Sequence, residues 1–457
     1  MSVDSQVPVA RALTVLTGTV CLLSPWASTP VLSATYALLL GALVVALLVV
    51  VRRPGAAVGV RPLLWLMAAA AVVGVALVGG IALVNGAGVP VLATAPVVLV
   101  LGGAAILVPG CLPRWSYAVL AVAYAVLVAA FVSTWDQPID VEVFVRDGVA
   151  ALARGESPYA LTFADVYPPG ESARVYGPGV VEDGRLQFGF PYLPAVLLLD
   201  LPMGLVGDPV WMHALLLGLA LALGWRVASD ALGRAAIVVL ALAPATPLVL
   251  ANYWIEPAIA GLFALTWWGM HRGRTWAVVL GLGAFFSAKQ YAAYFLPALW
   301  PVLRSSGVRV VLAAGAVGVV VVGSLALMDP REFYWSVVQL QFVQPFRDDA
   351  VSLLPALQEA VGELPGWLTT VSSLTGIVVS ALVAWRTRPG PTAFALCVGL
   401  GLLATVVLAK QAFVNYYSLI GAVLLLAGVG WPEDDPAQTR EPSSQGSRGE
   451  RGISSTR

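Results

Sequence analysis

Two lysines stand out among the cationic residues of this 457-residue chain. Lys and Arg together number 25, and only Lys289 and Lys410 are lysines. Each lies in an Ala-Lys-Gln run beside a long apolar segment. A compact ammonium on a flexible stem suits a phosphate as a point charge. The two lysines therefore predict an anion site, and the alternative is that both snorkel to the membrane interface without a ligand.

Further polar residues lie close to these lysines or at similar segment ends. Asn415 and Tyr416 follow Lys410, although an aromatic belt would also explain the tyrosine. Arg347 is a second anion candidate, and a simple Arg–Asp pair with a neighbouring aspartate is the alternative. Glu256 is an isolated carboxylate at a membrane edge, where ionisable groups are functional candidates by default.

Two carboxylates begin a helical pattern in the longest polar stretch between apolar segments. Asp140 and Glu142 precede apolar positions that recur at helical spacing, so a helix is expected from Val141 to Arg154. Asp140 also suits a helix N-cap. Glu142 can also pair with Arg146, four residues further on. Chemistry and helix stabilisation both remain open for these carboxylates.

The composition excludes most classes of protein. Hydrophobic residues make up 59% of the chain and charged residues 11%, and the mean hydropathy is +0.87. Soluble domains carry about 25% charged residues, so an all-α, polytopic membrane protein is expected. Equal numbers of acidic and basic residues exclude a basic nucleic-acid binder. Three dispersed cysteines and two histidines predict neither disulfides nor a metal centre, but the need for a divalent metal stays open.

About 13–14 membrane segments are expected from apolar runs of suitable length. The runs are 10–25, 32–51, 62–85, 89–110, 115–133, 191–207, 210–226, 235–251, 254–270, 276–303, 307–328, 366–385, 391–409 and 413–431. Arginines between them place both termini in the cytoplasm by the positive-inside rule. That topology requires 191–207 to be re-entrant and 276–303 to be a hairpin with its tip near Lys289.

Four regions follow from this topology. Residues 1–133 are N-terminal transmembrane helices, and 134–190 are an outer loop with an amphipathic helix. Residues 191–431 are a transmembrane core with a second outer loop at 329–365, and 432–457 are a disordered cytoplasmic tail. The broken segments can exist only where they line a cavity or are buried in protein. The sequence therefore predicts one outward-facing cavity at membrane depth.

Several short motifs in residues 134–431 resemble the GT-C superfamily of integral-membrane glycosyltransferases, and most of all glycosyltransferase family 87. The motifs are an Asp that opens a large outer loop, a Gly-x-x-x-Tyr turn, a Pro-rich aromatic segment and a late Lys-led helix start. They read Asp140-Val141-Glu142, Gly155-Glu156-Ser157-Pro158-Tyr159, Phe190-Pro191-Tyr192-Leu193-Pro194 and Lys410-Gln411-Ala412-Phe413-Val414-Asn415-Tyr416-Tyr417.

This resemblance implies an inverting transfer of a sugar, often mannose in that family, from a polyprenyl-phosphate donor to a lipid-linked or cell-envelope glycan acceptor. It implies that Asp140 is the general base, with Glu142 as a second catalytic carboxylate. The donor phosphate would be bound by Lys289, Lys410, Arg347, Tyr416 and Asn415, with Glu256, Gln290 and Tyr159 as auxiliary residues.

Two other classes of function remain open. A lipid or polysaccharide transporter or flippase would also need an anion site at membrane depth. A non-catalytic membrane subunit would use Asp140 only as a helix cap. The Ala, Val, Gly and Arg usage is typical of actinobacteria, so a plasma membrane with its lipids as partners is expected, and no nucleic acid.

Overall fold

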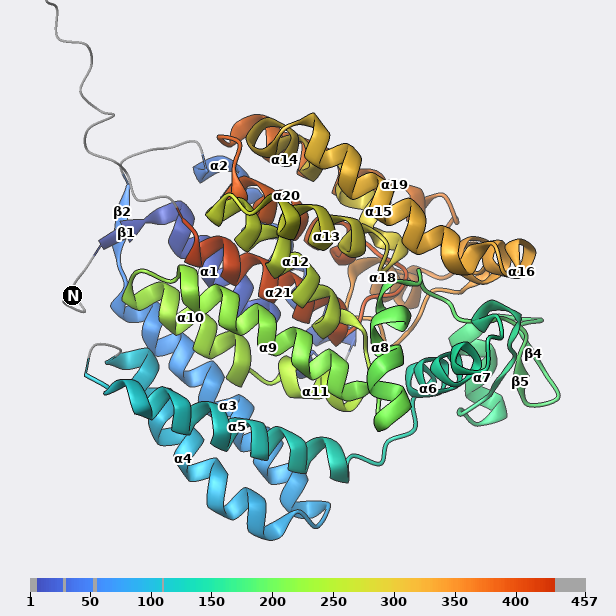
Figure 1. Ribbon diagram of the computed structural model, residues 1–457, viewed down its shortest axis with the longest axis horizontal. Coiled ribbons are helices and arrows are strands. Elements are labelled where there is room, and N and C mark those ends of the chain that lie inside the picture. Colours follow the sequence, from blue (N-terminus) through green and yellow to red (C-terminus); the bar gives the residue numbers. More distant parts are fainter. Residues whose placement is uncertain (1–5, 28–29, 52–55, 109–110, 432–457) are drawn as a thin grey trace, which may run out of the picture.

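The structure, a computed structural model, describes residues 6–27, 30–51, 56–108 and 111–431. The predicted cytoplasmic tail 432–457 lies outside the described residues. Almost every described element is helical, and Figure 1 shows the helices as one elongated bundle with a smaller group of elements at one end. The predicted all-α class is therefore confirmed.

The N-terminal helices are apolar, and all of them except the first are long. They are α1 (Val9–Cys21), α2 (Pro30–Val50), α3 (Arg61–Val84), α4 (Gly88–Leu107) and α5 (Arg114–Thr134). A short 3₁₀ turn, η1 (Ser24–Trp26), separates α1 from α2, and two short strands, β1 (Gln6–Pro8) and β2 (Ala57–Gly59), pair antiparallel. Helices α3, α4 and α5 pack on one another at the lower left of Figure 1.

Residues 140–186 form the small group of elements at the right end of Figure 1. It contains α6 (Asp140–Ala153), η2 (Pro158–Ala160), α7 (Pro169–Tyr176) and a sheet of β3 (Phe163–Ala164), β5 (Arg185–Leu186) and β4 (Val181–Glu182) in that order. Leu186 is the register partner of both Phe163 and Val181. The apolar face of α6 packs on the helix that follows this group, so α6 is fixed to the bundle.

The centre of the bundle consists of helices that are apolar on every side. They are α12 (Glu256–Arg272), α20 (Pro391–Val407) and α21 (Val414–Val429), and every residue of α20 from Ala393 onwards is buried. An apolar helix without a polar face must be surrounded by protein or by lipid. Around this centre lie α8 (Ala195–Val206), α9 (Val210–Val227), α10 (Ala231–Leu242) and α11 (Ala245–Ala251).

A helix break occurs where the sequence predicts the tip of a hairpin. Helix α13 (Thr275–Phe286) stops before Lys289, and the chain continues as a 3₁₀ helix, η3 (Gln290–Ala298), and α14 (Leu299–Ser306). Pro297 lies inside η3, and a proline cannot donate a helical hydrogen bond. Helix α15 (Val308–Ala326) then packs against α13.

The region 329–365 holds short helices, followed by one long helix. They are α16 (Pro330–Tyr334), the π-helical turn η4 (Trp335–Gln339), α17 (Leu340–Val343), α18 (Leu353–Val361) and the long α19 (Leu368–Arg386). Helix α19 packs against both η3 and α20. Within 329–365, the carbonyl of Val337 accepts a hydrogen bond from the amide of Gln290, so this region contacts the break at Lys289.

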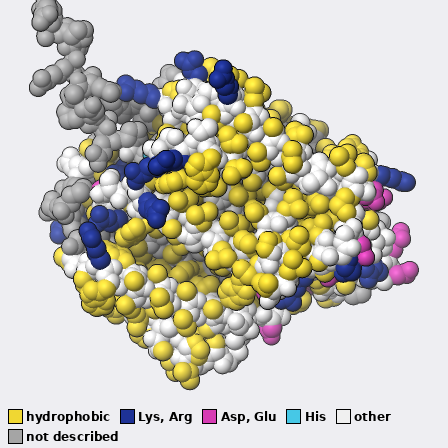
Figure 2. Space-filling model, viewed as in Figure 1, with side chains coloured by type: hydrophobic (Ala, Val, Ile, Leu, Met, Phe, Trp, Pro, Cys, Tyr) yellow, Lys and Arg dark blue, Asp and Glu magenta, His cyan; other side chains and the backbone are white. Residues whose placement is uncertain are grey.

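Eight of the described helical segments are long and apolar enough to cross a membrane. Five shorter apolar helices accompany them: α1, α8, α13, α20 and α21. Figure 2 shows a surface covered by hydrophobic side chains, with Lys and Arg near both ends and most visible Asp and Glu near one of them. The chain is thus a polytopic membrane protein.

Candidate functional site

Lys289 forms a buried ion pair in the break between α13 and η3. Its ammonium lies 2.6 Å from Oε1 of Glu256, the first residue of α12, and both side chains are almost fully buried. Removing either partner would leave an uncompensated charge away from water, so the two residues act as one neutral unit. The predicted auxiliary residue Glu256 and the predicted anion ligand Lys289 are therefore direct partners.

Three tyrosine rings surround the ammonium of Lys289. Its Nζ atom lies 4.7 Å from the ring centroids of Tyr192 and Tyr416, and 5.3 Å from that of Tyr291. A cation held over aromatic faces within about 6 Å is stabilised electrostatically. Tyr416, a predicted ligand, thus contacts the lysine itself. Tyr192 and Tyr291 are functional candidates that the sequence did not single out.

Several buried polar atoms around this lysine have no hydrogen-bond partner. They are Oε2 of Glu256, the hydroxyl of Tyr291 and Oδ1 of Asn415. Buried polar atoms in folded proteins almost always have partners, so such exceptions call for an explanation such as a ligand or an ordered water. Glu256 and Tyr291 both contact Lys289, so two of these unpartnered atoms lie beside the lysine and favour a site that binds a polar group there.

Lys410 lies in the turn between α20 and α21, and it lines the same cavity as Lys289. Its ammonium donates to the backbone carbonyls of Gln341 and Gln344, at 2.6 Å each. A lysine has three donors, so one remains for another acceptor. Burial lowers the pKa of Lys410 to about 8. No carboxylate neutralises this ammonium among the described residues, so it brings a positive charge to the site.

A cavity of about 390 Å³ lies between the two lysines. Its walls come from η3, α17, α19, α20 and the turn that holds Lys410. Besides Lys289, Lys410 and Tyr416, the lining is rich in amides and hydroxyls: Gln290, Tyr291, Tyr294, Gln341, Gln344, Thr369, Thr370, Ser372, Ser373, Thr405 and Gln411. The structure thus brings the two lysines that were predicted to share a site to the wall of one polar cavity.

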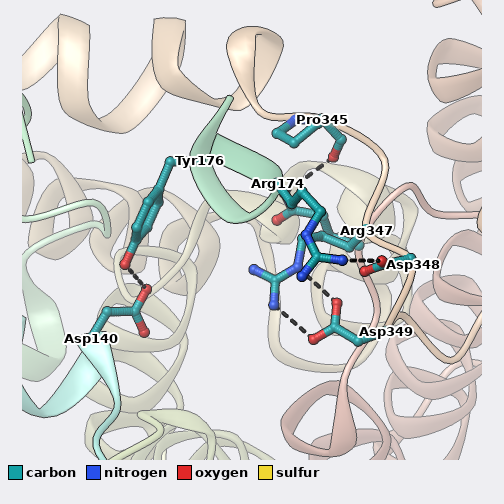
Figure 3. A network of polar contacts seen from close by, with 8 residues as sticks. Asp140, Arg174, Tyr176, Pro345, Arg347, Asp348 and Asp349 are labelled. Atoms are coloured by element: carbon teal, nitrogen blue, oxygen red, sulfur yellow. Dashed lines mark hydrogen bonds and ion pairs between the residues drawn. The ribbon is translucent and has the colours of Figure 1, made fainter. Parts of the chain in front are cut away.

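Asp140 and Arg347 lie in a second polar group, shown in Figure 3. Tyr176 donates a hydrogen bond of 2.9 Å to Oδ2 of Asp140, and Arg347 binds Asp349 through two hydrogen bonds of 2.7 Å. The alternative Arg–Asp pairing for Arg347 is therefore present. Burial raises the pKa of Asp140, against the opposing effects of the Tyr176 hydrogen bond and the positive charge of Arg347.

The ends of two helices fix the positions of Asp140 and Tyr176. Asp140 is the first residue of α6 and accepts a hydrogen bond of 2.8 Å from the N–H of Val141. Tyr176 ends α7, and Gly177 follows with φ of +92°. A side chain at Gly177 would also come within 3.1 Å of the carbonyl of Val343. The absence of a side chain at Gly177 therefore allows the end of α7 to lie close to the segment that leads to Arg347.

Three predicted residues have structural roles here. Glu142 pairs with Arg146 at 2.9 Å, as the helical spacing predicted, and Arg146 also binds Asp208. The hydroxyl of the fully buried Tyr159 donates to the carbonyl of Tyr192 at 3.0 Å, which fixes that ring beside Lys289. The amide of Gln290 donates to the carbonyls of Pro191 and Val337. These contacts position the site and leave Glu142 away from the cavity lining.

A further ionisable pair was missed in the sequence. Asp200 of α8 and His213 of α9 are both fully buried, with Oδ2 of the aspartate 3.0 Å from Nε2 of the histidine. Asp200 lies inside an apolar run, which is the signal that could have found it. Within the described residues, no group of three or more His, Cys, Asp or Glu could hold a metal ion.

Comparison with known proteins gives one similarity to a curated protein. A protein of Mycolicibacterium smegmatis named "MFS-type efflux pump" is 34% identical over 157 residues, which are 30% of this chain and 36% of that protein. The chain thus spans about a third of the length of this relative. No family model matches the chain. No solved structure matches it either.

The resemblance to GT-C glycosyltransferases, and the sugar-transfer function drawn from it, are wrong. The similarity that the chain does show is to a protein named as a transporter. The motifs behind the resemblance are short, and one of them has a structural explanation, because Tyr159 of the Gly-x-x-x-Tyr turn supports Tyr192. The catalytic roles of Asp140 and Glu142 were implied by the same resemblance, and no comparison tests them.

Proposed function

We propose that this chain is a membrane transporter or flippase that moves an amphipathic substrate with a phosphate group. The observation that carries the proposal is the positive charge of Lys410 at the wall of a polar cavity inside an otherwise apolar bundle. Lys289 is already neutralised by Glu256, so Lys410 leaves the cavity with an excess of positive charge. An anionic group would satisfy that charge.

The polar lining supports a phosphate as the anionic group. A phosphate offers several strong acceptor oxygens, and the cavity offers the remaining donor of Lys410, the unpartnered hydroxyl of Tyr291 and several amides. Arginine binds phosphate through two parallel N–H donors, but phosphate does not require that geometry. The ammonium of a lysine can therefore bind it as a point charge.

The apolar surroundings support a substrate with a hydrophobic tail. Phe342 lines the cavity and is 83% exposed, and exposed Val371, Leu374 and Val378 cover α19 beside it. These side chains face the space that lipid would fill around a polytopic protein. A tail could therefore stay in the hydrocarbon while the head enters the cavity.

The partial similarity to a protein named as an efflux pump also supports a transporter. We place the protein in the plasma membrane, with a polyprenyl phosphate or another phosphate lipid as its substrate and membrane lipids as its surroundings. The cavity then opens to the face opposite the arginine-rich loops, as the positive-inside rule indicates.

The test is a flipping assay in proteoliposomes with fluorescent, nitrobenzoxadiazole-labelled polyprenyl phosphate. Dithionite bleaches only probe in the outer leaflet, so flipping by the protein increases the fraction of probe that is bleached. We expect wild type to flip the probe and Lys410→Gln to lose most of this activity. Arg309→Gln, at an exposed cation outside the cavity lining, is the matched control and should behave as wild type. A wild-type rate equal to protein-free vesicles, or full activity of Lys410→Gln, would refute the proposal.

A further inference from the structure

A second and larger hollow lies between α5 and α9. It has a volume of about 950 Å³ and a floor formed by α10. Figure 2 shows this hollow on the face where hydrophobic side chains dominate. Its lining is almost wholly hydrocarbon and aromatic, and shares no residue with the lysine cavity. Ligand sites typically have volumes of about 300–1,000 Å³, so the hollow is large enough for one.

The hollow is a groove that follows the helix axis. Its lining runs along α9 from Trp211 to Arg226, a distance of about 22 Å at the helical rise of 1.5 Å per residue. The hydrocarbon core of a bilayer is about 30 Å thick. A groove of this length and lining matches an extended hydrocarbon chain that lies parallel to the helices.

One end of the groove carries positive charge. Arg226 lines the groove in the last turn of α9 and is exposed. Arg234, in the first turn of α10, lies close enough to Tyr117 of the groove to interact with it electrostatically. Neither arginine forms an ion pair within 4.0 Å in the part of the chain that the structure describes. The carboxylate of Asp230 lies close enough to Arg234 to interact with it, but that carboxylate is already paired with Arg11.

Aromatic residues mark the same end. The rings of Tyr117 and Trp225 are in contact, with centroids 4.8 Å apart, and both line the groove beside Arg226. Tyrosine and tryptophan favour the headgroup level of a membrane, where an amphipathic ring has both apolar and polar neighbours. The cationic end therefore lies at the membrane interface, and the remainder of the groove extends into the hydrocarbon.

We infer that this groove is a binding site for an anionic membrane phospholipid. Its phosphate lies at Arg226 and Arg234, and one of its acyl chains fills the space between α5 and α9. The guanidinium groups supply the charge that a phosphate needs, and the apolar lining replaces the hydrocarbon contacts of the chain. The site is independent of the proposed transport function, because it uses neither lysine of the cavity.

Gly218 offers a direct way to block the groove. It lines the groove on α9, and no atom lies within 4 Å of the position that a Cβ atom would take. Gly218→Phe therefore fills the groove without a clash in its backbone environment. Gly80→Phe is the matched control, because Gly80 lies in α3, is exposed, has the same open surroundings and does not line the groove.

The experiment is native mass spectrometry of the purified, delipidated full chain with added phosphatidylglycerol or phosphatidylcholine. We expect wild type and Gly80→Phe to retain phosphatidylglycerol in preference to phosphatidylcholine, and Gly218→Phe to lose both lipids. Arg226→Gln and Arg234→Gln should each weaken phosphatidylglycerol binding by about fivefold while phosphatidylcholine binding stays unchanged.

Two results of this experiment would overturn the inference. One is retention of phosphatidylglycerol by Gly218→Phe at the wild-type level, and the other is equal retention of the two lipids by wild type. A diazirine in the acyl chain of phosphatidylglycerol gives an independent check, since its cross-links should fall on α5 and α9. Cross-links confined to α15 or α19 would also contradict the site. The lipid-binding experiment does not measure transport. A negative result there would therefore contradict only the lipid site, whereas full flipping by Lys410→Gln would contradict only the proposed transport function.

Discussion

The charge of Lys410 should make transport sensitive to mildly alkaline pH. Burial lowers the pKa of this lysine to about 8, well below the ordinary value of a lysine. The ammonium therefore loses its proton as the pH rises through 8, and the cavity then loses its excess positive charge. Activity that depends on an anion in the cavity should fall over the same pH range.

The size of this effect follows from the pKa. With a pKa of about 8, about nine-tenths of the molecules carry the ammonium at pH 7, and about one-tenth carry it at pH 9. A phosphate monoester has its second pKa near about 6, so the probe keeps nearly the same charge across this range. Flipping should therefore decrease about tenfold between pH 7 and pH 9.

Lys410→Arg provides the decisive comparison. A guanidinium keeps its charge at pH 9, because its pKa exceeds about 12. The flipping assay with labelled polyprenyl phosphate, run with equal buffers on both sides of the membrane, should give a steep profile for wild type and a flat one for the arginine variant. A flat wild-type profile, or the same loss in both proteins, would show that the charge of Lys410 does not set the rate.

Two further predictions concern other ionisable residues. His213→Leu should lower the free energy of unfolding by roughly 1–3 kcal/mol, because it leaves the buried carboxyl of Asp200 without its hydrogen-bond partner. Unfolding in detergent measures this, and the double variant with Asp200→Leu should recover most of the loss. Asp140→Asn should change how stability varies with pH, because burial raises the pKa of this carboxyl. Because the pKa is higher in the folded protein, the stability of wild type decreases as the pH rises above the unfolded value of about 3.9. An amide does not titrate. The stability of the variant relative to wild type should therefore increase between acidic and neutral pH. A constant stability difference across that range would contradict the assignment for Asp140.

The long helices could be predicted closely from the sequence. Expected segments 62–85 and 115–133 correspond to α3 (Arg61–Val84) and α5 (Arg114–Thr134), because composition and length alone determine which stretches can cross a membrane. The helix expected from Val141 to Arg154 is also present, one residue earlier at each end. The two-residue strands β3 to β5 were not expected, since such short pairs carry no alternating pattern.

The site could be predicted only in part. Lys289 and Lys410 were expected to share a site because of their rarity and similar neighbours, and both line one cavity. Their partners depend on the packing of distant segments: Glu256 lies 33 residues from Lys289, and the carbonyls that bind Lys410 belong to α17 and its end. Short sequence motifs do not encode such contacts, and for the same reason they misled the assignment of function.

The turn that holds Lys410 is tied to the region of Arg347 by several backbone bonds. The N–H of Arg347 donates to the carbonyl of Lys410, and the N–H of Val351 donates to the carbonyl of Ala412. The hydroxyl of Ser352 binds the carbonyl of Ala409 as well. These two segments must move together. If the turn moves when an anion enters the cavity, Arg347 would move with it and change the electrostatic surroundings of Asp140. Binding at the cavity would then also affect the polar group that contains Asp140 and Arg347.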